Sequence, residues 1–181
     1  QNDYFPLGKW PLEGTEAAAS QAAKIVSAFR EKALPVIHVR HENPAADAPF
    51  FVAGSEGAQI HRCLSPLDSE PVVIKHKPNS FQNTELKALL DQQAVSRLVI
   101  VGAMSHMCID AGTRAAADYG YDCTVVHDAC ATRGLAFEGL EVSPAQVHAA
   151  FMSALSGAYA QVLPTEAVLD SLTATAPAQD G

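Results

Sequence analysis

Short apolar runs rich in Val and Ile alternate along the chain with segments whose apolar residues recur at helical spacing. Runs such as 96–102 (SRLVIVG) are nearly all apolar, which is typical of strands covered on both faces. Segments such as 15–33 carry Ala, Ile, Val and Phe three and four positions apart, as amphipathic helices do. This alternation predicts an α/β fold, a three-layer doubly wound parallel sheet with helices on both faces.

The pattern places the individual elements. We predict strands at 34–40, 71–75, 97–102, 121–127 and 160–163. We predict helices at 15–33, 84–93, 108–120, 143–157 and 165–172. We expect a single domain over 1–172, followed by a loose tail at 173–181. The long segment 41–70 has no clear periodicity, and loops of that length in compact domains usually form a functional rim or lid.

The start of the chain departs from the alternation. Helix 15–33 has no strand before it, and QNDYFPLG (1–8) has the turn residues Pro6 and Gly8 of a loop that leaves a strand. An α/β sheet should have an apolar run upstream of this loop. We therefore expect the first strand of the sheet to lie before Gln1.

Composition excludes several classes of protein. Of the 181 residues 48% are hydrophobic, which indicates a globular chain. The net charge of −8 argues against nucleic acid as a partner, since phosphate binding needs a basic face. We see neither an apolar run of membrane-spanning length nor a signal peptide, and so expect no membrane association. The four cysteines form no C-x-x-C pair, which favours a reduced, cytoplasmic setting.

Cys108 occupies the joint between an apolar strand and a helix, in the stretch GAMSHMCIDAG. A thiol near a helix N-terminus feels the positive end of the helix dipole, which favours the reactive thiolate. Free backbone N–H groups at such a turn also stabilise an oxyanion. The alternative is a buried cysteine that packs as a small hydrophobe, and position alone leaves both interpretations open.

Lys75 is the second candidate, because it ends the run VVI at another strand's carboxyl edge. An ammonium group beside a thiol favours thiolate. Lys77 is its rival, but Pro78 follows and we expect Lys77 to be exposed. Of the other cysteines, Cys123 and Cys130 are expected to be structural, and Cys63 has no evident partner.

Histidines are the usual bases for a cysteine nucleophile. His106 lies two residues before Cys108, too close in a tight turn to point at it, and is expected to line the pocket instead. His38 and His41 fall on opposite faces of a strand, so a metal site formed with His61 has little support. We therefore expect no metal and no cofactor.

Two stretches, VIKHKPNSF (73–81) and VIVGAMSHMCIDAGTRAAADYGYDCTVVHDACAT (99–132), resemble the isochorismatase-like cysteine hydrolases, near the nicotinamidase-related branch. The segment 1–8 is similar to the one that follows the first strand in that family. The resemblance extends to about residue 170 and implies a six-stranded parallel sheet flanked by helices.

The resemblance implies an Asp-Lys-Cys triad in which Cys108 is the nucleophile and Lys75 the lysine. The aspartate would fall two residues before Gln1, and Asp3 is not its equivalent. The family also implies a cis peptide bond between Ala103 and Met104, with the Met104 and Cys108 N–H groups forming the oxyanion hole.

Tyr4 matches an aromatic residue that packs on the substrate in nicotinamidases, and with His106 and Met107 it completes the expected substrate pocket. The metal motif D-x-H of nicotinamidases is absent from VRHENP, and true isochorismatases lack the cysteine. The expected activity is hydrolysis of a C–N bond in a small amide, carbamoyl or ureido compound through a thioester. A non-catalytic ligand- or partner-binding protein and an oxidant-sensing thiol protein are the alternatives.

Family members often form dimers or tetramers, and the Ala-rich segment 145–155 offers apolar residues such as Phe151 and Met152. We therefore expect a homodimer or homotetramer whose substrate is a small molecule.

Overall fold

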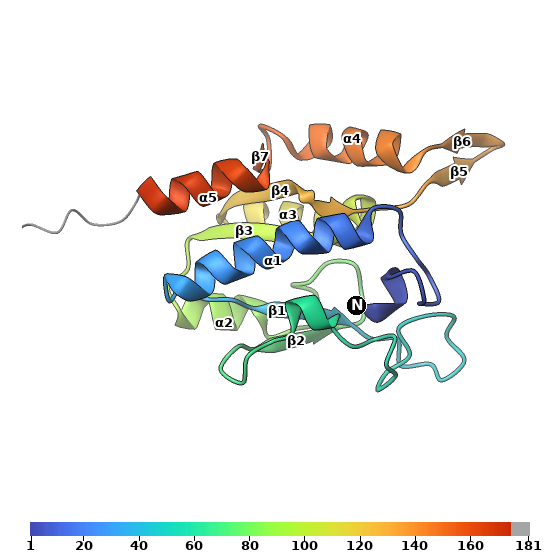
Figure 1. Cartoon of the computed structure of the whole chain (residues 1–181), viewed down its shortest axis with the longest axis horizontal. Helices are drawn as coiled ribbons and strands as arrows, with labels where there is room; N and C mark the ends of the chain where they lie inside the picture. Colours follow the sequence, from blue (N-terminus) through green and yellow to red (C-terminus); the bar gives the residue numbers. More distant parts are fainter. Residues whose placement is uncertain (175–181) are drawn as a thin grey trace, which may run out of the picture.

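The structure is a computed structural model that describes residues 1–174. Parallel strands form the middle layer (Figure 1). One group contains β1 (His38–His41) and β2 (Val72–Lys75), and the other contains β3 (Arg97–Ala103), β4 (Asp122–Ala131) and β7 (Gln161–Leu163) in the order β3-β4-β7. Pairing within both groups is parallel, so the predicted parallel α/β fold is confirmed.

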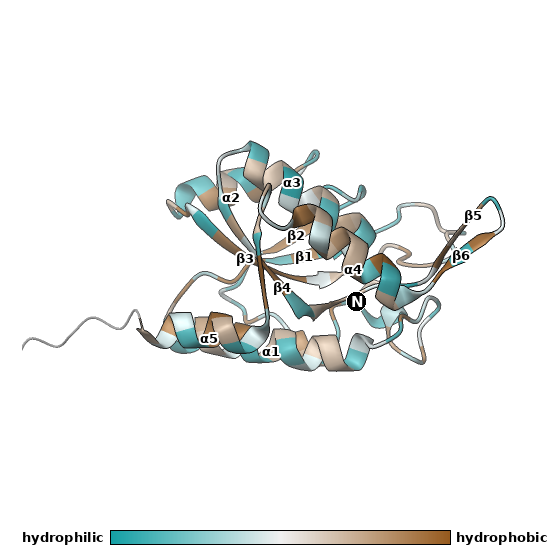
Figure 2. Cartoon of the chain, turned by 90° about the horizontal axis from the view of Figure 1, so that it is seen from above, coloured by the Kyte–Doolittle hydropathy of each residue, from teal (hydrophilic) through white to brown (hydrophobic). Residues whose placement is uncertain are grey.

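Helices cover both faces of the strands (Figure 2). On one side lie α1 (Thr15–Glu31) and α5 (Thr165–Ala174), and on the other α2 (Leu86–Gln92), α3 (Asp110–Asp118) and α4 (Pro144–Leu155). Short helical turns are η1 (Asn2–Tyr4), η2 (Arg62–Leu64) and η3 (Ser105–Ile109), the last a turn of π-helix. α5 runs two residues past its expected end, and residues 175–181 of the expected tail lie outside the described residues.

Within residues 1–174, an antiparallel hairpin adds two strands that the alternation did not predict. β5 (Leu135–Phe137) pairs with β6 (Leu140–Val142), and the hairpin projects from the body of the molecule (Figure 1). Its turn is Glu138–Gly139, with φ of 48° and 80°, the left-handed geometry that two-residue hairpin turns need. Phe137 and Leu140 are 74% and 68% exposed, so this hairpin carries apolar surface.

The apolar side chains expected on segment 145–155 pack against other parts of the same chain. Met152 is buried in the main core, and Phe151 packs edge-on against the His106 ring, with ring centroids 6.0 Å apart. The exposed apolar surface therefore lies on the β5–β6 hairpin more than on α4.

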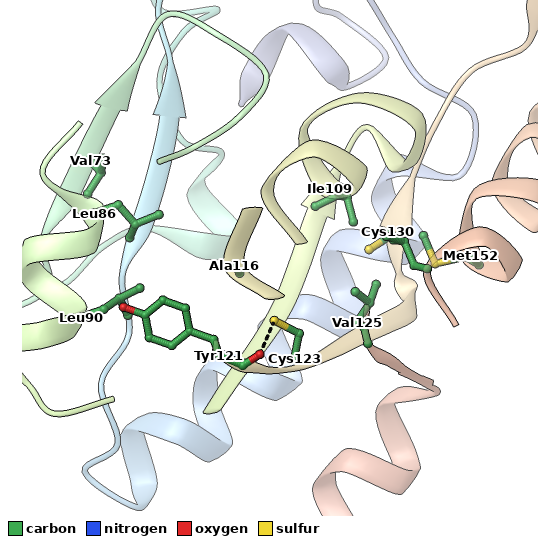
Figure 3. Close-up of a cluster of buried hydrophobic side chains, with 12 residues drawn as sticks. Val73, Leu86, Leu90, Ile109, Ala116, Tyr121, Cys123, Val125, Cys130 and Met152 are labelled. Atoms are coloured by element: carbon green, nitrogen blue, oxygen red, sulfur yellow. Dashed lines mark hydrogen bonds between the residues drawn. The ribbon is translucent and has the colours of Figure 1, made fainter. Parts of the chain in front are cut away.

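The main core lies between the strands and helices α2, α3 and α4 (Figure 3). Val73, Val125 and Ala116 in it are completely buried. Cys123 and Cys130 belong to the same cluster, and burial raises their pKa values to about 11 and about 12. Both thiols therefore stay protonated at neutral pH and pack as small apolar groups, as the sequence predicts.

The two groups of strands do not pair with each other within residues 1–174. Between β1 and β3 lies a cavity of about 260 Å³, whose walls include Val39 of β1, Val99 and Val101 of β3, and Ala22 of α1. The predicted strand 34–40 begins only at His38, and the Pro35–Ile37 segment before it lines this cavity. Gln1 lies at the rim of the same cavity.

A buried carboxylate ties α1 to the start of β1. Glu70 accepts two hydrogen bonds from the Arg30 guanidinium at 2.7 Å and contacts the His38 ring at 2.8 Å. The Glu70 side chain is only 8% exposed. The hydrogen bonds from Arg30 lower the Glu70 pKa to about 2, although burial acts in the opposite direction.

Glu70→Gln is therefore expected to lower the free energy of unfolding by about 2 kcal/mol at pH 7. A carboxylate with a lowered folded-state pKa stabilises the fold above its unfolded-state pKa. That contribution is lost as the pH falls from about 5 toward 2. Urea unfolding at pH 7 and pH 3 should show a wild-type advantage that shrinks at the lower pH. Asp91→Asn is the control, because Asp91 pairs with Lys87 at the surface. If wild type were more stable than Glu70→Gln by the same free energy at pH 7 and pH 3, the stabilising role of the Glu70 carboxylate would be contradicted.

Candidate active site

Cys108 lies at the carboxyl edge of the parallel strands. β3 ends at Ala103, the bond from Ala103 to Met104 is cis, and the π-helical turn η3 then leads into α3. The cis bond is at the position that the resemblance implies. Cys108 is half-buried in this turn, whereas Cys123 and Cys130 are buried. Of these three cysteines, Cys108 is therefore the one with partial exposure, and it lies at the strand-to-helix joint.

Backbone contacts fix the shape of the turn. The Met107 and Ile109 N–H groups both donate to the Met104 carbonyl, at 3.0 and 3.2 Å. Gly102, just before the turn, has φ of 133°, a conformation that residues with a side chain rarely adopt. The β3–β4 register also shifts between Ile100 and Gly102. The sequence therefore needs glycine here to bring the chain out of the sheet.

Lys75 is the last residue of β2 and is 4% exposed. Its Nζ donates to the Pro78 carbonyl at 2.6 Å. Within residues 1–174 no carboxylate lies within ion-pair distance of this ammonium group. A buried charge that meets only a neutral acceptor is costly, and such groups are normally paired.

Tyr4 connects the N-terminal loop to the nucleophile turn. It is 6% exposed, and burial raises its pKa. The charge of Cys108 raises that pKa further and the charge of Arg133 opposes it, so all three residues share one electrostatic environment. The Tyr4 ring packs edge-on against Phe51, with centroids 4.8 Å apart, and the Arg133 guanidinium lies 5.0 Å from the Trp10 ring centre. Part of the long loop 41–70 thus borders the site, through Phe51.

Asp3 holds this loop arrangement together. Its buried carboxylate accepts hydrogen bonds from the Phe51 N–H at 2.7 Å and the Lys9 N–H at 3.2 Å. A side chain at Gly57 would collide with that carboxylate, so glycine is required there. Sequence reasoning did not signal this structural role of Asp3.

The contacts of the His106 side chain are with residues other than Cys108. Its Nδ1 meets the Thr132 hydroxyl at 2.5 Å, and its ring packs against Phe151. Burial and the charge of Arg133 lower the His106 pKa. Met107 is 40% exposed. Neither side chain lines the cavity between β1 and β3, whose wall includes Tyr4.

The carboxyl end of β1 adds two features that the sequence did not signal. The Gln1 side chain bridges the strand end, donating to the His41 carbonyl at 2.6 Å and accepting from the His41 N–H at 3.0 Å. Burial, followed by the charges of Lys75, His76 and Lys77, lowers the His41 pKa to about 4. His41 is therefore neutral at pH 7, beside a cluster of positive charge.

The three histidines considered for a metal site are not brought together. His38 is bonded to Glu70, and the His61 ring stacks on Phe5 at 3.6 Å. In the part of the chain that the structure describes, no three His, Cys, Asp or Glu side chains form a group that could hold a metal ion. None of the helices between Gln1 and Ala174 has the length and apolar character needed to cross a bilayer.

Comparison with known proteins identifies the family. The isochorismatase domain model matches residues 1–167. The uncharacterized isochorismatase family protein YddQ of Bacillus subtilis is 51% identical over 169 residues, 93% of this chain and 94% of that protein. A solved structure from Oleispira antarctica, named for the isochorismatase hydrolases, superposes with a TM-score of 0.90 at 57% identity and covers 94% of this chain and 91% of its own.

A relative with a named activity is the maleamate amidohydrolase of Pseudomonas putida. It is 28% identical over 133 residues, 66% of this chain and 62% of that protein. The family model, the relatives and the parallel α/β fold all indicate the same family. The chain belongs to the isochorismatase family and is a hydrolase.

Proposed function

We propose that the protein hydrolyses a C–N bond in a small amide, carbamoyl or ureido compound, with Cys108 as the nucleophile. The observation that carries this proposal is that two unusual groups each lie at the carboxyl end of a parallel strand, Lys75 at the end of β2 and Cys108 just after the end of β3. Cys108 is a half-buried cysteine at a strand-to-helix joint. Lys75 is a buried ammonium group that forms no ion pair with any carboxylate of residues 1–174. The activity in the name of the maleamate amidohydrolase is of the same class.

The carboxylate that Lys75 needs would come from a strand preceding Gln1. β1 and β3 are not hydrogen-bonded to each other, and the cavity lies between them. Gln1 is one of the residues that line this cavity. A strand placed in this cavity would complete the sheet. The aspartate two residues before Gln1 would then lie at the same carboxyl edge as Lys75 and Cys108.

The reaction follows from these roles. The aspartate accepts the thiol proton, and the Cys108 sulfur attacks the carbonyl carbon to form a tetrahedral oxyanion. The Met104 and Cys108 N–H groups donate to that oxyanion. The C–N bond breaks as the aspartate returns the proton to nitrogen, and ammonia or an amine leaves. Water then cleaves the thioester, restoring the thiol and releasing the acid.

The surroundings suit this chemistry. Lys75 stabilises the negative charge shared by the aspartate and the thiolate. His41 and His106 both have lowered pKa values and would remain neutral, so neither competes as an acid at pH 7. Tyr4, with His106 and Met107 nearer the surface, would contact the substrate. The mechanism needs no metal and no cofactor, and its substrate is a small molecule rather than nucleic acid.

Compartment, branch and assembly belong to the same proposal. The four cysteines, all free thiols, suit a cytoplasmic protein. The resemblance of the cysteine motif supports a position near the nicotinamidase-related branch. Exposed Phe137 and Leu140 on the projecting hairpin support a homodimer or homotetramer. Sedimentation at micromolar concentration is expected to show an assembly of two or four chains, and monomer alone would contradict it.

A panel of small primary amides, carbamoyl compounds and ureido compounds tests the activity. The protein is assayed with the residues that precede Gln1, and ammonia release is followed by a coupled enzyme assay. We expect at least one compound to give ammonia and the corresponding acid in equal amounts. Ammonia from no member of the panel, with Cys108 shown to be reduced, would count against amide hydrolysis.

A further inference from the structure

The nucleophile turn contains a completely buried hydroxyl group. Ser105, three residues before Cys108, has no exposed surface. Its Oγ lies 3.4 Å from the Ala131 carbonyl at the end of β4, which is at the long limit for a hydrogen bond. Its good partner is Nδ1 of His148, at 2.8 Å. Without His148 the hydroxyl would keep only the weak contact.

His148 belongs to α4, an element remote in sequence from the nucleophile. The start of that helix is fixed by a capping box, in which Ser143 and Gln146 each bond the other's backbone, with Pro144 in the first turn. Burial, and then the charge of His127, lowers the His148 pKa. The lowered pKa favours a neutral His148 ring on a well-anchored helix, and its Nδ1 shares a hydrogen bond with the Ser105 hydroxyl, which donates when the ring proton is on Nε2.

The neighbouring residue shows the same kind of attachment. His106 is held at Nδ1 by the Thr132 hydroxyl, just past the end of β4. Two successive residues of the turn are thus fixed by side chains from other elements. Since a small displacement of a reacting atom lowers the rate strongly, such attachments bear on the position of Cys108.

We propose that His148 is a positioning residue for the Cys108 nucleophile and acts through the Ser105 hydroxyl. The inference rests on the proposed role of Cys108. His148 touches neither the thiol nor the substrate in this scheme. Its bond to Ser105 fixes the turn η3 between the end of β4 and α4, so that the sulfur stays aligned with the carbonyl carbon it attacks.

The test compares His148→Leu, which removes the bond, with His148→Asn. The Asn side-chain oxygen is two bonds from Cβ, as Nδ1 is in histidine, so Asn retains an acceptor near the same place. We expect His148→Leu to lower kcat about 10-fold with KM within about twofold, and His148→Asn to recover most of the loss. Ser105→Ala should lower kcat as much as His148→Leu, and the double variant should lose no more than either single one.

Ser153→Leu on the exposed side of α4 is the matched control and should leave kcat unchanged. Circular dichroism melting confirms that each variant is folded at the assay temperature. Equal losses in the Leu and Asn variants, or additive losses in the double variant, would overturn the proposal.

A second measurement separates this inference from the proposed activity. The rate of Cys108 alkylation by iodoacetamide, followed by peptide mass spectrometry, needs no substrate. We expect His148→Leu to change that rate at least about threefold and His148→Asn to restore it. An unchanged rate in His148→Leu overturns the positioning role, even where ammonia release is observed. If His148→Leu changes the alkylation rate and His148→Asn restores it, but the wild-type protein releases no ammonia, the positioning role stands and only amide hydrolysis is contradicted.

Discussion

Cys108→Ala is expected to lower kcat by about 10⁴-fold or more, because the variant retains no group that can form the thioester. The fold should be unaffected, since the Cys108 side chain is half-buried in a turn and is not part of the main core. Ammonia release under single-turnover conditions measures the loss. Substrate binding, followed by calorimetry, should change little.

Cys63→Ala is the matched control for that experiment. Cys63 is the exposed thiol of the chain and lies 3.0 Å from the His61 ring, in the loop 41–70 and outside the nucleophile turn. Its removal should change kcat by less than about twofold. Retention of activity in Cys108→Ala, or an equal loss in Cys63→Ala, would refute the assignment of the nucleophile.

Lys75→Met is expected to lower kcat about 10² to 10³-fold, because it removes the positive charge that stabilises both the aspartate and the thiolate. Methionine has a similar length and no charge, so it fills the same buried space without leaving an ammonium group unpaired. The variant should therefore remain folded. The alkylation rate of Cys108 at neutral pH should fall as well, because less thiolate is present.

Lys77→Met provides the comparison, since Lys77 lies two residues further on and is exposed. Its loss should leave both kcat and the alkylation rate nearly unchanged. If Lys77→Met were as damaging as Lys75→Met, general positive charge at the strand end would explain the effect, and the specific role of Lys75 would be wrong.

Much of the fold could be predicted because its main signals are local. The parallel strands fall within or overlap the predicted segments, since buried parallel strands are continuously apolar and need no knowledge of their partners. The start of β1 was misplaced, since strand geometry at 34–37 depends on a neighbour and the described residues supply none. The β5–β6 hairpin was missed because its strands are three residues long and its turn, Glu138–Gly139, is a weak signal.

Candidate site residues could be predicted from the sequence at the ends of strands, but contacts between distant segments could not. Cys108 and Lys75 could be singled out as candidates because each ends or follows an apolar run, and the structure shows that Lys75 is buried. The bond from His148 to Ser105 joins residues 43 positions apart, and the Gln1 bridge to His41 spans 40. No periodicity encodes such contacts, which arise only from how the elements pack.

The central claim is that the acyl group passes through Cys108, and trapping the intermediate tests it most directly. A substrate found in the amide panel is mixed with the protein, the reaction is quenched in acid within milliseconds, and the protein is digested for mass spectrometry. The account predicts a peptide containing Cys108 that is heavier by the acyl group and loses that mass on treatment with hydroxylamine. Steady turnover with Cys108 unmodified at every quench time, and with undiminished activity in Cys108→Ala, would contradict it.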